Sequence, residues 1–462
     1  MTIRNVGANA YPTIASAMAD SIGGDTINLK AGYSDEAATV TAQNMMIDGG
    51  VSSTNIALQL GAGIGDITLL GSAGFDVTDN SGNNTITGNA GRNTFEVSSG
   101  ADVIHGGGGV DRLVIDYSSV AATITGTVGG VTDGGIHSVT FDGVENFTIR
   151  TGAGNDTITT ADGDNKIKTL DGNDTITTGD GRSNIASGAG NDTVTAGDGG
   201  NKVNGGAGDN SITTGDGKDS IHTRTGNDTV ITGGDADVTM VSGGIDSVNS
   251  GTGHDQLIVR YSAATSDVIG TLSAGTLAAG YDGSVADSAG NSVTYSGTEN
   301  FNITTGHGND NLTTGGGRDV LSTRAGDDRL DAGDGRDELA GGGGADTLIG
   351  GKGADHLTGG QGGDVFLFRS LGDSRTNGMD RLWDLQNADT IDVGQIDADM
   401  SQAGNQDFVL VGAFTGVAGQ ATFLYDSGAN QTYLSLDANG DSVADFALAL
   451  EGDCRGFENF VL

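Results

Sequence analysis

The apolar residues of this chain recur with a nine-residue period over much of its length. In residues 151–258, twelve consecutive units each carry one large residue between polar neighbours that are mostly Thr, Ser or Lys. One inward side chain between two outward ones is the alternation of a short β-strand, and a fixed repeat of such strands predicts a solenoid. The inward residues, which we expect to form the core, are Ile158, Ile167, Ile176, Ile185, Val194, Val203, Ile212, Ile221, Val230, Thr239, Val248 and Leu257. Thr239 is the one polar residue in this stripe.

A glycine-rich turn with one acidic residue precedes most of these strands. Residues 341–367 show it most regularly, as GGGGADTLI, GGKGADHLT and GGQGGDVFL, which is the pattern G-G-x-G-x-D-x-U-x with U a large apolar residue. Glycine permits a tight, partly left-handed turn and exposes backbone carbonyls, while aspartate supplies a hard, charged oxygen. Oxygen ligands of both kinds suit calcium. The candidate carbonyl ligands are Gly342, Gly344, Gly351 and Gly353.

This nonapeptide resembles the RTX, or haemolysin-type, calcium-binding repeat. The resemblance implies an all-β fold, a right-handed parallel β-helix or β-roll, in which two units form one coil and calcium lies between stacked coils. The repeats occupy residues 79–114, 151–258 and 305–367, which we take as three β-roll blocks. The candidate aspartate ligands, all at the sixth position of a unit, are Asp102, Asp111, Asp156, Asp174, Asp192, Asp219, Asp228, Asp237, Asp246, Asp255, Asp310, Asp319, Asp328, Asp337, Asp346, Asp355 and Asp364.

Successive units lie on opposite edges of such a roll, so the sixth positions should be read alternately. Counting same-edge neighbours that are both Asp predicts about ten calcium ions. Neutral sixth positions, such as Asn84 and Asn93, should bind calcium weakly or not at all. Four units of the middle block have an acidic third position instead, which either supplies an alternative ligand or is a solvated carboxylate. These residues are Asp162, Asp180, Asp198 and Asp216.

Two related segments, residues 115–150 and 259–304, interrupt the repeat. Two stretches in or beside the first segment have counterparts in or beside the second: DRLVIDYSS corresponds to DQLIVRYSA, and SVTFDGVENFTI corresponds to SVTYSGTENFNI. The chain is therefore also duplicated on a larger scale. Alternating apolar residues predict longer strands here, in wider coils or in a hairpin that flanks the roll. We expect these insert coils to act as spacers.

Residues 1–78 lack the nonapeptide. TIASAMADSI, from Thr13, has apolar residues at helical spacing and a Thr N-cap, and short strand-like runs such as DTINL follow. This opening resembles that of pectate-lyase-like right-handed β-helices, which implies an N-terminal helix that caps the first coil.

Residues 368–462 are richer in aromatic and large apolar residues. GGDVFLFRS, MDRLWDLQNADTIDVGQID and the end ENFVL resemble the C-terminal domain of serralysin-type secreted proteases. The resemblance implies a β capping domain with an uncleaved signal for the type I secretion machinery. As an alternative, Glu458-Asn459-Phe460 repeats Glu145-Asn146-Phe147 and Glu299-Asn300-Phe301 and closes one more coil.

One loop of this segment has partial calcium-loop spacing. Asp437, Asn439, Asp441 and Asp445 occupy positions 1, 3, 5 and 9 of an EF-hand-like loop, but the glycine is misplaced and position 12 is Leu448. We treat the four residues as candidate metal ligands, with a polar β-turn as the alternative.

Composition narrows the class of protein. The chain has 462 residues, 84 Gly, one Pro, one Cys and a formal net charge of -40. Such charge disfavours nucleic acid and anionic membranes as partners and should keep the metal-free chain expanded. Cys454 alone excludes an internal disulfide framework. The N-terminus lacks a basic segment followed by an apolar one, and no transmembrane run is present, so we expect secretion to the extracellular space or cell surface without an N-terminal signal peptide.

No catalytic motif accompanies the repeats. None of the six His begins an H-E-x-x-H motif, and G-x-S-x-G is absent, so we expect no enzyme activity. The first functional hypothesis is a calcium-rigidified structural protein of a surface layer, matrix or filament, or an adhesin shaft, which self-associates. The second is a solenoid that binds polysaccharide or, with less support, ice. A non-catalytic remnant of a secreted polysaccharide-modifying enzyme also fits.

Overall fold

The fold consists of parallel β coils in two compact units. The computed structural model describes residues 2–7, 11–29, 37–50 and 55–462. The chain divides into a first unit, Met1–Thr223, and a second unit, Arg224–Leu462. Among the described residues, no helix is both long and apolar enough to cross a membrane.

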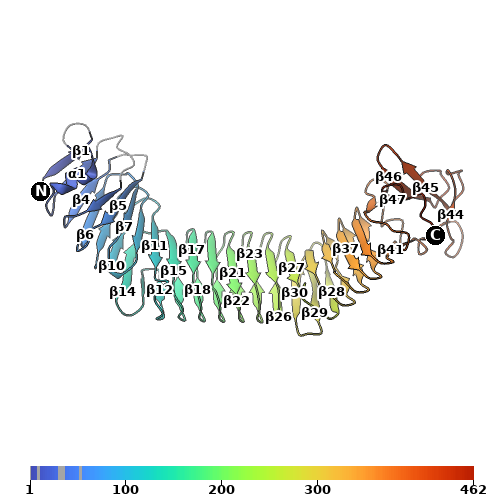
Figure 1. Cartoon of the computed structure of the whole chain (residues 1–462), viewed down its shortest axis with the longest axis horizontal. Coiled ribbons are helices and arrows are strands. Elements are labelled where there is room, and N and C mark those ends of the chain that lie inside the picture. Colours follow the sequence, from blue (N-terminus) through green and yellow to red (C-terminus); the bar gives the residue numbers. More distant parts are fainter. Residues whose placement is uncertain (1, 8–10, 30–36, 51–54) are drawn as a thin grey trace. The chain divides into compact units, whose positions relative to one another are not determined.

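The middle repeats of the first unit form two facing parallel sheets. β16 (Thr157–Thr159) pairs with β18 (Thr175–Thr177), which pairs with β20 (Thr193–Thr195), and Ile158, Ile176 and Val194 lie in register. Figure 1 shows the short strands of these repeats stacked side by side. One coil is therefore eighteen residues, as predicted. The second sheet here contains β15 (Asn146–Arg150), β17 (Asn165–Lys168), β19 (Ser183–Ala186), β21 (Lys202–Gly206) and β23 (Ser220–Thr223), and β22 (Ser211–Thr213) extends the first.

The predicted apolar stripe forms the core between the sheets. Ile158, Ile176 and Ile212 are fully buried, and Val194 is buried too, whereas Thr157 and Thr175 face outward. Burying an aliphatic side chain of this size stabilises a fold by roughly 1.5–3 kcal/mol. Because each coil adds only two such residues, the core is one side chain wide, and stability must come from elsewhere as well.

The N-terminal coils of the first unit continue both sheets with larger core residues. Met45, Phe75 and Phe95 are buried there, where the repeats use Ile or Val. One sheet contains β1 (Ile3–Val6), β2 (Thr26–Leu29), β4 (Met45–Asp48), β6 (Asp66–Leu70), β8 (Thr85–Thr87) and β10 (Gly100–His105). The other contains β3 (Ala38–Val40), β5 (Ile56–Leu60), β7 (Phe75–Thr78), β9 (Thr94–Val97) and β11 (Arg112–Asp116).

The predicted capping helix is present only as a short element. α1 spans Ile14–Ala19, and Thr13 caps it by accepting a hydrogen bond from the Ser16 backbone N–H, as the sequence predicts. Its buried face is Ile14, Ala17 and Met18. Six residues give a helix only about 9 Å long, which is too short to close the end of a two-sheet coil. The expected role of a capping helix is therefore not supported.

In each insert the chain forms three strands of one sheet that pair antiparallel, which agrees with the hairpin alternative. In the first unit, β13 (Gly130–Thr132) pairs antiparallel with both β12 (Thr125–Thr127) and β14 (His137–Asp142). The two outer strands then join the regular coils, because β14 pairs parallel with β10 and β12 pairs parallel with β16. In the second unit, the longer strands β28 (Val268–Thr276), β29 (Gly280–Asp287) and β30 (Ser292–Thr298) repeat this order. There β30 pairs parallel with β26 (Ile245–Asn249) and β28 with β32 (Asn311–Thr313).

The repeats of the second unit form the same two kinds of sheet. One contains β24 (Thr229–Ile231), β26, β32, β35 (Arg329–Asp331), β38 (Thr347–Ile349) and β41 (Val365–Leu367). The other contains β25 (Val238–Val241), β27 (Gln256–Arg260), β31 (Asn300–Thr304), β34 (Val320–Ser322), β37 (Glu338–Gly343) and β40 (His356–Gln361). A narrow sheet at one turn contains β33 (Gly316–Gly317), β36 (Asp334–Gly335) and β39 (Lys352–Gly353).

The C-terminal segment first continues the coils and then turns antiparallel. β42 (Asp380–Leu382) pairs parallel with β40, and β43 (Thr390–Asp392) with β41. β45 (Gln420–Asp426), β46 (Gln431–Asp437) and β47 (Phe446–Glu451) form an antiparallel sheet that joins β42 through β47. β44 (Val409–Leu410) flanks β45, and the chain end, β48 (Phe460–Val461), pairs parallel with β43. The end of the chain therefore closes a coil, as the alternative interpretation of Glu458-Asn459-Phe460 expects.

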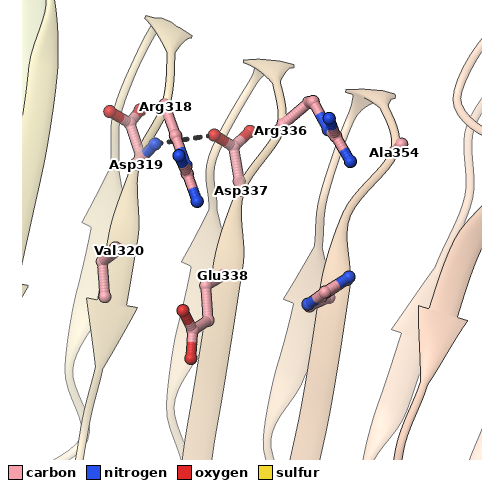
Figure 2. Close-up of a pocket in the computed structure, with 8 residues that line it drawn as sticks. Arg318, Asp319, Val320, Arg336, Asp337, Glu338 and Ala354 are labelled. Atoms are coloured by element: carbon pink, nitrogen blue, oxygen red, sulfur yellow. Dashed lines mark hydrogen bonds between the residues drawn. The ribbon is translucent and has the colours of Figure 1, made fainter.

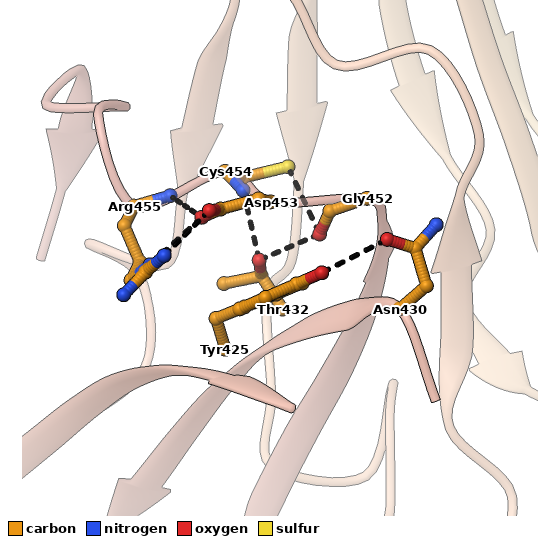
Figure 3. Close-up of polar contacts among 7 residues, drawn as sticks. All are labelled: Tyr425, Asn430, Thr432, Gly452, Asp453, Cys454 and Arg455. Atoms are coloured by element: carbon orange, nitrogen blue, oxygen red, sulfur yellow. Dashed lines mark hydrogen bonds and ion pairs between the residues drawn. The ribbon is translucent and has the colours of Figure 1, made fainter. Parts of the chain in front are cut away.

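Side-chain contacts hold the loop after β47 against β46 (Figure 3). Thr432 accepts a hydrogen bond from the Cys454 backbone N–H at 2.9 Å and donates one to the Gly452 carbonyl at 2.8 Å. Arg455 pairs with Asp453 and lies over the Tyr425 ring, 5.0 Å from its centroid. Cys454 is a free cysteine, and burial raises the pKa of its thiol.

Candidate calcium sites

The sixth-position aspartates stack from coil to coil through their backbone. Asp346 Oδ1 accepts a 2.8 Å hydrogen bond from the Asp328 backbone N–H, and Asp364 Oδ1 accepts one of 3.0 Å from Asp346. Their second carboxylate oxygens are buried and have no hydrogen-bond donor. Such an oxygen is costly unless a cation or a proton faces it. Nine of the described aspartates have a buried Oδ2 without a donor and no side-chain hydroxyl that lowers the pKa of the carboxyl group. They are Asp102, Asp111, Asp246, Asp255, Asp337, Asp346, Asp355, Asp364 and Asp380.

Burial raises the pKa of these carboxyl groups. For Asp346 and Asp355 the pKa rises to about 7, because the charged form is desolvated and the next Asp on the edge repels it. The pKa values of Asp102 and Asp111 rise to about 6, also because burial desolvates the charged form. A buried divalent cation would reverse this effect, since it favours the ionised form.

Glycine at the first position keeps space open before the carboxylate. A Cβ atom on Gly341 would lie 2.4 Å from Asp346 Oδ2, and one on Gly359 would lie 2.3 Å from Asp364 Oδ2. Gly342, one of the predicted carbonyl ligands, has φ +103°, which a side-chain-bearing residue rarely adopts. The unit thus needs glycine both for its turn and for the space that the aspartate faces.

Units that begin with Thr fill this space differently. Thr305 donates its hydroxyl to Asp310 Oδ2. The Thr169 hydroxyl lowers the otherwise raised pKa of Asp174, but it donates to the Ser187 carbonyl, and Asp174 Oδ2 has no hydrogen-bond partner. Seven of the twelve units in the middle block and the first three of the last block begin with Thr, whereas residues 341–367 begin each unit with Gly. The best-preserved repeats therefore also have the most open carboxylates.

Nine of the ten predicted Asp pairs stack within one unit or the other. In the first unit they are Asp156–Asp174 and Asp174–Asp192, and each has a backbone-to-carboxylate bond of 2.8 or 2.9 Å. In the second unit the seven pairs are Asp228–Asp246, Asp237–Asp255, Asp310–Asp328, Asp319–Asp337, Asp328–Asp346, Asp337–Asp355 and Asp346–Asp364. The tenth, Asp219–Asp237, has one member in each unit and stays a prediction.

Asparagine at the sixth position bonds its side-chain N–H group without a cation, although Oδ1 of Asn84 and of Asn93 is buried with no hydrogen-bond partner. In three units this N–H donates to the carbonyl two residues earlier, at 2.8 Å for Asn93 to Gly91, 3.0 Å for Asn165 to Gly163 and 2.7 Å for Asn201 to Gly199. The amide thus occupies the donor role that calcium would fill. This geometry agrees with the expectation that neutral units bind calcium weakly or not at all.

The structure adds two aspartates that the period did not predict. Asp355 donates its backbone N–H to Asp380 Oδ1 at 2.9 Å, and Asp364 donates to Asp389 Oδ1 at 3.0 Å. Each bond spans 25 residues instead of eighteen. Asp380 is fully buried and its Oδ2 has no donor, so burial and then Asp355 raise its pKa to about 9. Asp389 Oδ2 instead accepts from the Gln386 backbone N–H, which makes it the weaker candidate.

Two glutamates continue the second edge across the inserts. Glu145 Oε2 accepts a 2.7 Å hydrogen bond from the Asp111 backbone N–H, and Glu299 Oε2 accepts the same bond from Asp255. The adjacent asparagines, Asn146 and Asn300, donate to the carbonyls of the same two aspartates. Asn459 makes the corresponding contact with the Asp389 carbonyl at 2.7 Å. The repeated E-N-F signal therefore marks a strand that closes a coil.

The acidic third positions form an exposed column. Asp162 Oδ1 accepts the backbone N–H of Asp180, Asp180 that of Asp198, and Asp198 that of Asp216, each at 2.9 or 3.0 Å. All four residues are exposed. This is the arrangement expected of solvated carboxylates, and nothing here assigns them as ligands.

The EF-hand-like loop is stabilised by its own backbone. Asp437 accepts from the backbone N–H groups of Gly440 and Ser442, and Asp445 from that of Ala438, at 2.7 to 2.9 Å. These bonds are those of a polar turn and use the oxygens that a cation would need. Calcium binding by Asp437, Asn439, Asp441 and Asp445 stays a prediction.

The chemistry of the stacked sites fits calcium. Among the described residues, no three His, Cys, Asp or Glu side chains converge as a metal cluster. A site here would take carboxylate oxygens from two stacked coils and complete its shell with glycine carbonyls, and such all-oxygen sets suit calcium. Bound calcium would supply the positive charge that the buried Oδ2 atoms lack.

The protein family that matches this chain agrees with this assignment. Overlapping matches to the RTX calcium-binding nonapeptide repeat family cover residues 78–113, 148–248 and 304–366. Metalloprotease AprA of Pseudomonas entomophila (strain L48) is 37% identical over 89 residues, which are 19% of this chain and 18% of that protein. The AlgE6R3 subunit of the Azotobacter vinelandii mannuronan C5-epimerase is 29% identical and matches 32% of this chain and 79% of its own, with a TM-score of 0.24. The chain therefore carries RTX calcium-binding nonapeptide repeats in a parallel β-roll architecture.

Proposed function

We propose that this chain is an extracellular structural protein whose coils calcium stiffens, and that it works by self-association in a surface layer, matrix or filament. The observation that carries the proposal is the coil-to-coil series of buried, donor-free carboxylates. Each bound ion would join two coils, so rigidity would follow the calcium concentration outside the cell. Secretion by the type I machinery and the absence of catalysis are parts of the same proposal.

Repeating outer faces support the self-association. Thr157, Thr175 and Thr193 lie in register on neighbouring strands of one sheet, as do Thr159, Thr177 and Thr195. Neighbouring strands are about 4.8 Å apart, so the face offers a flat, regular array of hydroxyl and methyl groups. A second copy with the same spacing can meet such an array repeatedly, which suits lateral assembly.

Electron microscopy of the calcium-loaded full chain tests this function. The proposal expects ordered sheets or fibres that disperse when calcium is removed. A variant with Lys in place of Thr157, Thr175 and Thr193 should stay folded by circular dichroism but lose order, because like charges would face each other. Monodisperse particles from the unaltered protein at every calcium concentration would contradict the structural role.

A second candidate function, polysaccharide binding, has its own observation. A polar groove in the second unit has one cavity that Arg336, Arg381 and His356 line without any described acidic residue, and it does not depend on the Thr face.

A further inference from the structure

Two adjoining cavities in the second unit form one groove. The first, of about 180 Å³, is lined by Arg318, Arg336 and His356 together with Glu338 and the candidate calcium ligands Asp319 and Asp337. The second, of about 580 Å³, is lined by Arg336, His356, Arg381 and residues of the C-terminal segment, and no acidic residue in the described part of the chain lines it. Arg336, Ala354 and His356 line both. Because they share a wall, the two cavities are treated as one elongated site.

A single column of in-register residues forms the floor of this groove. The column crosses six neighbouring strands, which at about 4.8 Å per strand spacing makes it roughly 24 Å long. Its members are Val320, Glu338, His356, Arg381, Ala449 and Tyr433. A groove of this length suits a linear ligand of several residues more than a compact molecule.

Three arginines supply positive charge along one side. Arg318 and Arg336 occupy equivalent positions on neighbouring coils and reach over the same cavity (Figure 2). Among the described residues neither they nor Arg381 form an ion pair within 4.0 Å, although the charge of Arg336 lowers the pKa of Asp355. This is notable in a chain with 61 acidic and 21 basic residues. Guanidinium groups bind carboxylates through paired hydrogen bonds, so the second cavity, which Arg336 and Arg381 line without any of the described acidic residues, attracts an anion-bearing ligand.

The rest of the lining suits hydroxyl groups and flat rings. Asn377, Gln431 and Tyr433 line the second cavity and offer amide and phenol groups. Trp383, which is 46% exposed, lies next to the lining and packs edge-on against His356, with 5.8 Å between the ring centroids. Apolar lining is sparse, which disfavours an ordinary protein interface with its hydrophobic centre. Amphipathic aromatic rings beside polar groups instead present both an apolar face and hydrogen-bonding partners.

From this geometry we infer that the groove binds an acidic oligosaccharide, a chain of sugar residues bearing carboxylate groups. The arginines hold the carboxylates, while the amides, Tyr433 and Trp383 contact the sugar rings and hydroxyls. This inference deepens the second candidate function and does not require the structural role.

The calcium-loaded full chain can be titrated with a six-residue oligouronate at a fixed free calcium concentration. Trp383 is the single tryptophan of the chain and packs against His356 of the lining, so its fluorescence reports on the groove through that contact, and calorimetry provides an independent measurement. We expect saturable binding that Arg336→Ala/Arg381→Ala weakens about tenfold or more, since each arginine contributes a charge-assisted contact. The double variant should retain its circular dichroism and calcium content.

The matched control is Arg182→Ala/Arg324→Ala, which removes two exposed arginines that do not line the groove. We expect it to bind the oligouronate as the unaltered protein does. Equal weakening in both variants, or no binding in either measurement, would overturn the inference. A neutral six-residue glucose oligomer should not bind, and equal or tighter binding of hexaglutamate would assign the groove to an acidic protein instead. Because neither pair of substitutions touches the Thr face, electron microscopy would separate failure here from failure of the structural role.

Discussion

The backbone N–H of Asp355 donates a 2.9 Å hydrogen bond to Oδ1 of Asp380, which lies beyond the last nonapeptide. The contact repeats the stacking of the regular coils, although the intervening chain is seven residues longer than a regular coil of eighteen. The row of candidate sites therefore extends into the C-terminal segment.

Replacing Asp380 by Asn tests whether this residue binds calcium. We expect Asp380→Asn to hold fewer calcium ions per chain by atomic emission and to melt at a lower temperature with calcium. At pH 5 without calcium, where protonation of the buried carboxyl groups favours the fold, its melting temperature should stay the same or rise, because an amide is easier to bury than a carboxyl group with a donor-free oxygen. Asp407→Asn, at an exposed position, is the charge-matched control and should change neither value. An equal loss with and without calcium would mean that Asp380 acts only through its hydrogen bond.

The raised pKa values predict opposite pH dependences with and without calcium. Asp346 and Asp355 have pKa values of about 7 in the calcium-free fold, against an ordinary value of 3.8. Between these values the folded chain holds more protons than the unfolded chain, so calcium-free stability falls as pH rises from about 4 to about 7. Calcium requires the ionised form, so stabilisation by calcium should grow over the same range.

Thermal unfolding from pH 5 to pH 8 measures both trends. Melting temperatures in calcium-free buffer should fall toward pH 8, while the difference made by calcium should be smallest at pH 5. Parallel curves with and without calcium would contradict the assignment of these carboxylates as ligands.

Thr239 is a polar residue in an otherwise apolar core stripe. It is 1% exposed, and its hydroxyl has no hydrogen-bond partner. Thr239→Val keeps the shape of the side chain and removes the unpaired hydroxyl, so we expect stabilisation by about 1–2 kcal/mol. Thr177→Val, at a partly exposed outward position, should change stability little. Denaturant unfolding in calcium compares the two, and a loss of stability in Thr239→Val would show that the hydroxyl has an essential partner.

The regular coils could be predicted from sequence because one period encodes both packing and register. A residue such as Ile158 must face inward, and its partner eighteen residues later, Ile176, then stacks on it. The same spacing placed the sixth-position aspartates on two edges. The local helix signal was also sufficient, since Thr13 does cap α1. Whether six residues can close a coil depends on the width of the fold, which no local signal contains.

The missed residues lie where the period breaks. Asp380 and Asp389 follow a longer coil, so counting by nine loses them. Glu145 and Glu299 join the stacked carboxylates only after a hairpin, 34 residues beyond Asp111 and 44 residues beyond Asp255. The shared E-N-F sequence was the available signal. The role of this sequence depends on the position of the Glu carboxylate, which lies where a sixth-position Asp carboxylate lies in the regular coils. Only the packed coils show that position.

Circular dichroism of the full chain at pH 8 during a calcium titration tests the central claim most directly. If calcium holds the coils together, β signal should rise cooperatively with free calcium and disappear reversibly in excess chelator, because the chain carries a formal charge of -40 and many buried carboxylates. Magnesium at the same concentration is the control and should be much less effective, since it prefers a smaller, rigid octahedral site. An unchanged β spectrum in excess chelator would contradict the account.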